Sequence, residues 1–143
     1  DPVLIDQRGC TYIPHVTGAM VGQKVLIASS DKTMHNVHGL GKVNSQFNIG
    51  MAPGGPPLKR TFTKEEVMMP IKCDAHPWMQ TYVGVLSHPL YAVSGKDGSF
   101  EINDIPVGTY TLVAWQELMN TSEQSITIVE GETTDVTFTY IRK

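Results

Sequence analysis

The sequence predicts an all-β protein built from antiparallel β-sandwiches. Short apolar or alternating runs recur along the chain, helix signals are almost absent, and glycine and proline separate the runs. Short strands at this spacing are typical of sandwiches. With 143 residues, the chain has room for one domain of ordinary size or two small ones.

The first half of the chain contains the strands expected to be most buried. They are the apolar runs at residues 24–28 and 82–86, and an extended segment with Val67, Met69, Ile71 and Cys73 on one face. Residues 44–57, rich in glycine, proline and asparagine, are expected to form a surface loop. Thr63 to Glu66 resembles a helix start, and Pro70 limits its extension.

Turn signals are more regular in the second half. Strands are expected at residues 99–102, at 109–115, around Ile126 and Ile128, and at 136–141. The residues before His88 hold both cysteines and four of the five histidines, and His88 lies at the expected boundary. We therefore expect two domains, residues 1–88 with the chemistry and residues 89–143 as a scaffold or docking module.

Composition excludes several classes of function. The net charge of −3 gives no case for nucleic acid or an anionic membrane. No apolar run approaches the length of a membrane span. The chain begins Asp1-Pro2, so we expect a processed, exported protein in the periplasm or outside the cell.

The stretch C-D-A-H-P-W-M, residues 73–79, places a thiol, an imidazole and a thioether close together. A thiolate with imidazoles suits copper or zinc, and a thioether in addition favours copper. A blue-copper site needs one cysteine, two histidines and a weak axial ligand. The second histidine is expected from T-M-H-N-V-H, residues 33–38, which follows the strand at 24–28. The predicted cofactor is copper, as Cu(I) and Cu(II).

These segments resemble the cupredoxins, which are plastocyanin and its relatives, over residues 3–88. The resemblance lies in M-H-N-V at 34–37, in K-C-D-A-H-P-W-M at 72–79 running into Y-V-G-V at 82–85, and in Y-I-P at 12–14 followed by 21–25. It implies a Greek-key β-sandwich with the ligands His35, Cys73, His76 and Met79. It also implies that Asn36 joins the two ligand loops by hydrogen bonds.

Residues 89–143 resemble the transthyretin-like module of carboxypeptidase regulatory domains. The likeness lies in D-G-S-F at 97–100 and I-P-V-G-T-Y at 105–110. It implies a small antiparallel β-sandwich and says little about function.

Three residues leave alternatives open. The short spacing of two residues between His76 and Met79 resembles the binuclear centre of cytochrome oxidase, which uses two loop cysteines, so Met79 either binds more strongly than usual or misses the metal. Cys10 is a small buried residue near the site, an extra ligand of an unusual or binuclear site, or the disulfide partner of Cys73. His38 lies at an odd offset from His35, which predicts the opposite strand face and a place outside the ligand set; the alternative is a further ligand.

The sequence predicts a carrier of single electrons between redox partners through a mononuclear copper site with one cysteine, two histidines and one methionine. The partner would be a cytochrome or copper protein in weak, transient contact at Pro77 and Trp78. No catalytic signature stands out, so we do not expect an enzyme. The alternatives are a copper carrier or storage protein that also uses Cys10, and a metal-free sandwich with a Cys10–Cys73 disulfide.

Overall fold

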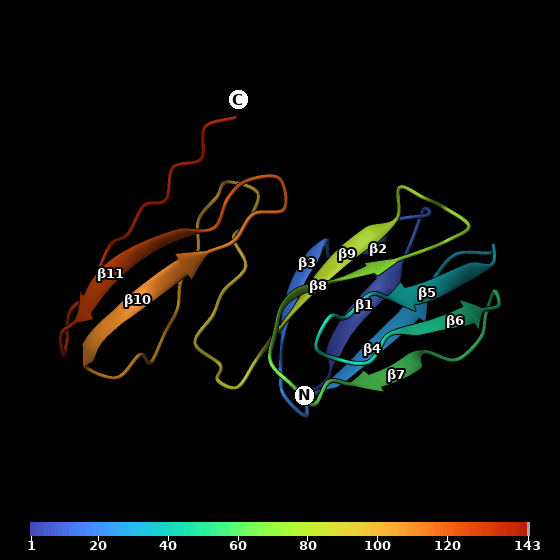
Figure 1. Ribbon diagram of the computed structural model, residues 1–143, viewed down its shortest axis with the longest axis horizontal. Helices are drawn as coiled ribbons and strands as arrows, with labels where there is room; N and C mark the ends of the chain where they lie inside the picture. Colours follow the sequence, from blue (N-terminus) through green and yellow to red (C-terminus); the bar gives the residue numbers. More distant parts are fainter. Residues whose placement is uncertain (143) are drawn as a thin grey trace. The chain divides into compact units, whose positions relative to one another are not determined.

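The computed structural model describes residues 1–142, and every regular element among them is a β-strand (Figure 1). The predicted all-β class is therefore confirmed. The chain divides into two compact units, Asp1–Glu101 and the residues from Ile102 onwards. None of the described residues belongs to a helix that could cross a bilayer.

The first unit is a sandwich of two sheets. One sheet has the order β2-β1-β4-β7, with β1 (Val3–Gln7), β2 (Tyr12–Ile13), β4 (Lys24–Ser29) and β7 (Leu58–Thr61). The other has the order β3-β9-β8-β5-β6, with β3 (Val16–Met20), β5 (His35–Gly39), β6 (Phe47–Met51), β8 (Glu66–Lys72) and β9 (Gln80–Leu86).

The sheets are mixed rather than purely antiparallel. β1 pairs with β4, and β3 with β9, in parallel, whereas the other pairs in this unit are antiparallel. The chain leaves the first sheet to form β3 in the second and returns to form β4. This crossover lets β4 run in the same direction as β1, as parallel pairing requires.

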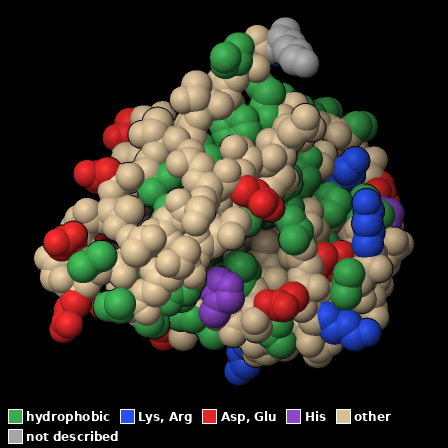
Figure 2. All heavy atoms as spheres, turned by 60° about the vertical axis from the view of Figure 1, so that its left-hand side comes forward, with side chains coloured by type: hydrophobic (Ala, Val, Ile, Leu, Met, Phe, Trp, Pro, Cys, Tyr) green, Lys and Arg blue, Asp and Glu red, His purple; other side chains and the backbone are tan. Residues whose placement is uncertain are grey.

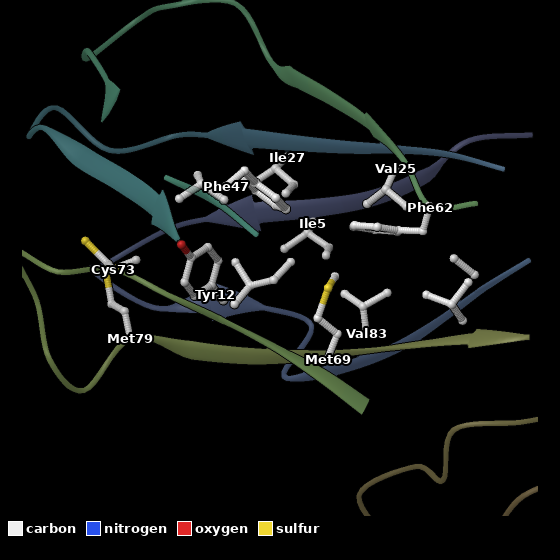
Figure 3. Packing of buried hydrophobic residues seen from close by; sticks show 14 of the residues in the cluster. Ile5, Tyr12, Val25, Ile27, Phe47, Phe62, Met69, Cys73, Met79 and Val83 are labelled. Carbon is white, nitrogen blue, oxygen red and sulfur yellow. The ribbon is translucent and has the colours of Figure 1, made fainter. Parts of the chain in front are cut away.

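Alternating side chains from both sheets fill the space between them. Figure 3 shows Ile5, Val25, Ile27, Phe62, Met69 and Val83 pointing into this common interior, and each is buried. Burial of apolar surface stabilises a fold by about 25 cal/mol per Å². Cys73 and Met79 lie together at one end of this core (Figure 3), which places the ligand loop at an end of the sandwich.

Three local predictions in the first unit were wrong. The expected loop at 44–57 contains β6, in which Phe47 and Met51 are buried; the glycine and asparagine between them masked the alternation. Val67 is 81% exposed instead of buried. A β-bulge between Glu66 and Met69, with Met68 at φ +49°, shifts the strand so that Glu66 occupies an inward position. Residues 63–66 form no helix.

The second unit contains one antiparallel sheet of β10 (Gly108–Ala114) and β11 (Ser122–Ile128). Within the described chain, the segments 99–102 and 136–141 are not strands, so the expected sandwich is a two-stranded sheet here. Val136, Phe138 and Tyr140 are nevertheless less exposed than their neighbours. The backbone oxygen of Thr137 accepts a hydrogen bond from Gln124, so side chains rather than a backbone ladder hold this segment.

The division between the units falls later than the expected boundary after His88. The ring of Tyr91 lies over Gly18 of β3, so close that an added Cβ on Gly18 would overlap it. Residues just beyond His88 therefore pack with the first unit. The assignment of residues 1–88 and 89–143 to two domains stays a prediction.

Charged side chains of both signs lie on the face of the molecule that Figure 2 presents. Figure 2 shows lysine and arginine side chains at separate positions on the face that it presents, with acidic side chains elsewhere on it. Hydrophobic side chains are exposed on the same face, and several large ones of the second unit are exposed. Val107, Leu118 and Ile141 are examples.

Candidate metal centre

His35 enters the site as the first residue of β5. Exposure alternates along this strand, so His35, Val37 and Gly39 face the core, whereas Asn36 and His38 are half-buried on the other face. The His35 side chain is fully buried. A buried imidazole needs partners for both ring nitrogens, and the structure supplies them on two sides.

Cys73, His76 and Met79 come from the loop between β8 and β9. The backbone N–H of Cys73 donates to the carbonyl of Met79 (3.3 Å), and the N–H of Met79 donates to the carbonyl of His76 (2.9 Å). These bonds close the loop into a compact turn. Cys73 and Met79 are buried and His76 is half-buried. The loop thus holds a sulfur inward and one imidazole at the rim.

Three donor atoms converge between β5 and this loop. The Nδ1 atoms of His35 and His76 lie 3.1 Å apart, and the Sγ of Cys73 lies 3.9 Å from the first and 3.6 Å from the second. All three donors fall within 4.8 Å of one another. His35, Cys73 and His76 are therefore brought together as predicted from the ligand spacing.

These separations fit a transition-metal ion. Protein-bound zinc, for comparison, lies about 2 Å from imidazole nitrogen and about 2.3 Å from thiolate sulfur, so donors around one such ion stand roughly 3 to 4 Å apart. Two nitrogen lone pairs at 3.1 Å repel each other unless a proton or a metal ion lies between them. One thiolate and two imidazoles are a donor set that suits copper.

The outer nitrogen of His35 fixes which ring atom faces the cluster. Its Nε2 lies 2.8 Å from the Asp31 carboxylate. Because an ionised carboxylate only accepts, Nε2 carries the proton and Nδ1 presents a lone pair toward Cys73. The N–H of Cys10 lowers the pKa of Asp31, with His35 and Gly9 acting in the same direction, so the carboxylate stays ionised.

Cys10 is also brought to the site. Its Sγ lies 3.9 Å from the Nε2 of His76, and it forms a second potential metal-binding group with Asp31 and His35. Both cysteines are free thiols, and Cys10 is half-buried rather than fully buried. The structure therefore has no Cys10–Cys73 disulfide, and it brings Cys10 close to the cluster.

Asn36 joins the two ligand segments. Its Oδ1 accepts hydrogen bonds from the N–H of Asp74 (2.6 Å) and from the thiol of Cys73 (3.3 Å). Tyr12, a fully buried residue of β2, adds a second tie because its hydroxyl lies 3.3 Å from the carbonyl of Asn36 and 3.1 Å from that of Lys72. Both ligand segments are thus fixed to one frame.

His38 lies outside the metal-binding group. Its Nδ1 is 2.9 Å from a carboxylate oxygen of Asp74, and the amide of Asn48 donates to the other oxygen (2.8 Å). These bonds lower the pKa of Asp74, His38 making the largest contribution. The alternation of β5 explains why His38 faces away from His35.

The remaining predicted residues occupy the rim and the interior. Pro77 is exposed, and Trp78 is 67% exposed with its ring 5.2 Å from that of His76. Met79 is fully buried beside Cys73 (Figure 3). Sequence reasoning missed Asp31, although a carboxylate four residues before a predicted ligand was the available signal.

Comparison with protein families finds a match in the C-terminal part of the chain. A carboxypeptidase regulatory-like domain model matches residues 82–140. No curated protein sequence matches the chain.

Solved structures resemble the first unit. An oxidised mutant of amicyanin is 22% identical with a TM-score of 0.52, covering 58% of this chain and 80% of that one. A purple cupredoxin from Nitrosopumilus maritimus is 21% identical with a TM-score of 0.50, covering 58% and 98%. A copper-containing nitrite reductase from Thermus scotoductus is 23% identical with a TM-score of 0.54, covering 62% of this chain but only 23% of the enzyme. The chain has the cupredoxin fold, followed by a segment similar to a carboxypeptidase regulatory-like domain.

Proposed function

We propose that the chain is a copper protein that carries single electrons between redox partners through one copper ion. His35, Cys73 and His76 would hold the ion, with Met79 as the axial ligand. The observation that carries this proposal is the convergence of two imidazole nitrogens and one thiol within 4.8 Å at the end of a cupredoxin sandwich. When bound, copper supplies a one-electron couple between Cu(I) and Cu(II).

The surrounding residues would keep the ligand positions nearly constant in both oxidation states. Asp31 holds the His35 ring by its outer nitrogen, and Asn36 holds the backbone of the Cys73 loop. Tyr12 lies against both segments from the buried side. A frame fixed by such hydrogen bonds leaves the ligands little to reorganise.

His76 would be the exit for the electron because it is the less buried of the two histidines. Exposed Pro77 and Trp78 flank it and offer an apolar contact. A small apolar contact suits the brief encounters of redox proteins. We expect a cytochrome or another copper protein as the partner, in the periplasm or outside the cell.

A carrier fits the comparisons better than an enzyme does. The amicyanin match covers 80% of that protein, whereas the match to the nitrite reductase covers 23% of the enzyme. The chain therefore corresponds to nearly a whole small cupredoxin and to a minor part of the enzyme.

Copper reconstitution tests this proposal. Addition of Cu(II) to the reduced apoprotein should produce an intense visible charge-transfer band and a copper electron paramagnetic resonance signal. Cys73→Ser should abolish the band, since its thiolate is the donor, whereas Ser45→Ala, a change of an exposed residue, should leave it. A band of unchanged intensity in Cys73→Ser would reject the assignment.

A copper carrier or storage role is the second candidate. It is favoured by Cys10, whose Sγ lies 3.9 Å from His76 and offers an additional soft donor. Voltammetry separates the two roles, because a carrier of electrons should show fast, reversible cycling. Slow, irreversible cycling with tight Cu(I) binding would favour storage.

A further inference from the structure

Cys10 is held rigidly although it lies in the turn between β1 and β2. Its φ of +53° is uncommon for a residue other than glycine. The Asp31 carboxylate accepts hydrogen bonds from the N–H groups of Gly9 (2.7 Å) and Cys10 (2.9 Å), and the Trp78 indole donates to the carbonyl of Cys10 (2.8 Å). The backbone that carries this thiol is therefore fixed from both sides.

The ring of His76 lies between two sulfur atoms. Its Nδ1 is 3.6 Å from the Sγ of Cys73, and its Nε2 is 3.9 Å from the Sγ of Cys10. Cys73 is buried, whereas Cys10 is half-buried. The two thiols thus approach opposite nitrogens of one imidazole, and the more accessible thiol is the outer one.

Cys10 Sγ and His76 Nε2, the outer pair of donors, have the chemistry of a site for a soft metal ion. Thiolate sulfur is a soft ligand and prefers Cu(I) to hard divalent ions such as Mg²⁺ and Ca²⁺. Zinc bonds, for comparison, are about 2 Å to imidazole nitrogen and about 2.3 Å to thiolate sulfur. The sum of two such bonds is little more than the 3.9 Å between Cys10 Sγ and His76 Nε2. An ion between Cys10 and His76 therefore needs only a small movement of either side chain. Cys10 also belongs to a second group of potential metal donors, together with the Asp31 carboxylate and His35.

We propose that Cys10 Sγ and His76 Nε2 form an outer Cu(I) site through which the inner ligands are loaded. The inference rests on the proposed copper function. Cys10 releases its thiol proton to solvent when it takes the ion. When the ion passes to the inner ligands, Cys10 regains a proton and Cys73 releases its own thiol proton. The copper stays Cu(I), so no electron is exchanged.

His76 serves one site at a time. A neutral imidazole has one lone pair, so His76 presents Nε2 to the outer site or Nδ1 to the inner one and changes its protonated nitrogen between them. The chain therefore binds one copper ion in total, and Cys10 affects how that ion is acquired more than how many are held.

The outer site is tested where the inner thiol is missing. Cys73→Ser, titrated anaerobically against a chromophoric Cu(I) chelator, should still withdraw one Cu(I) per chain. Adding Cys10→Ser or His76→Ala to that variant should weaken Cu(I) binding at least tenfold. Met34→Leu is the control, because it removes a thioether that is 61% exposed next to His35 and should change nothing. Equal Cu(I) binding with and without Cys10, or with and without His76, would overturn the outer site.

A kinetic measurement covers the case in which Cys73→Ser fails to fold. Cys10→Ser keeps all inner ligands and should acquire Cu(I) from the chelator at least tenfold more slowly than the wild type, with the same final stoichiometry of one. Equal rates would overturn the relay. The two proposals fail separately: wild-type protein with no charge-transfer band defeats the copper function, whereas a normal band with equal loading rates defeats only the outer site.

Discussion

The Asp31 carboxylate contacts both the proposed ligand His35 and the turn at Gly9 and Cys10. It accepts from His35 Nε2 and from the N–H groups of Gly9 and Cys10. Asp31→Asn preserves the size of the side chain but loses the charge and one acceptor. Loss of such a carboxylate behind a metal-binding histidine typically costs about 10- to 100-fold in metal affinity. Competition with a chromophoric copper chelator should show a loss of this order.

The control for Asp31→Asn is Asp97→Asn. Asp97 is an exposed carboxylate of the same unit that accepts a hydrogen bond from Ser99 and touches no predicted ligand. Its copper affinity should equal that of the wild type. If the two variants bind copper equally well, Asp31 does not orient His35.

At the scale of the strands, the packing of β6 against β5 requires the Phe47 ring to lie directly over Gly39. An added Cβ there would overlap the Phe47 ring, whereas one on Gly50 of β6 would meet only the end of Met34 at 3.4 Å. Gly39→Ala should lower the free energy of unfolding by about 1–3 kcal/mol through overpacking. Gly50→Ala should stay near the wild type, and urea unfolding measures both. Similar losses in both variants would mean that Phe47 moves aside freely.

The bulge at the start of β8 creates a pH-dependent contribution to stability. Glu66 is buried, which raises its pKa, but hydrogen bonds from Asn44, Val43 and Lys42 outweigh burial and lower the pKa to about 2. The folded pKa lies below the ordinary value of 4.5. Stability from Glu66 is therefore present above that value and lost as the pH falls toward 2.

Glu66→Gln tests this contribution. The amide replaces a charged acceptor with a neutral one and should cost about 1–3 kcal/mol at pH 7. The difference from the wild type should shrink as the pH falls from 4.5 toward 2 in urea unfolding. Glu101→Gln, which changes an exposed carboxylate, should leave stability at pH 7 unchanged. A constant difference at all pH values would show that Glu66 acts through packing instead.

Most of the fold and much of the candidate site could be predicted from the sequence, for physical reasons. Strand periodicity depends on local alternation, so the runs that became β4, β9, β10 and β11 were predictable. The spacing of potential ligands predicted that His35, Cys73 and His76 would lie close together, because a metal site requires its donors to converge. Val67 and β6 could not be predicted, since a bulge and a partner strand decide which side chains face inward.

The same reasoning applies to the whole chain. Whether residues 99–102 and 136–141 become strands depends on the neighbours they find, and alternation alone does not supply a partner. The sequence named Cys10 as a candidate, but its contact with Asp31 depends on the turn after β1 folding against the turn before β5. The boundary between the units likewise depends on a contact, that of Tyr91 with Gly18.

Truncation locates that boundary. A chain ending at Glu101 keeps Tyr91 over β3, whereas one ending at His88 removes it and uncovers apolar surface. Loss of this half-buried aromatic should cost about 1–2 kcal/mol, which lowers the unfolding temperature by roughly 5–15 °C for a unit of this size. Differential scanning calorimetry compares the two chains, with Tyr91→Ala in the longer chain as the matched control. Equal unfolding temperatures would place the end of the first domain at His88, where the sequence predicted it.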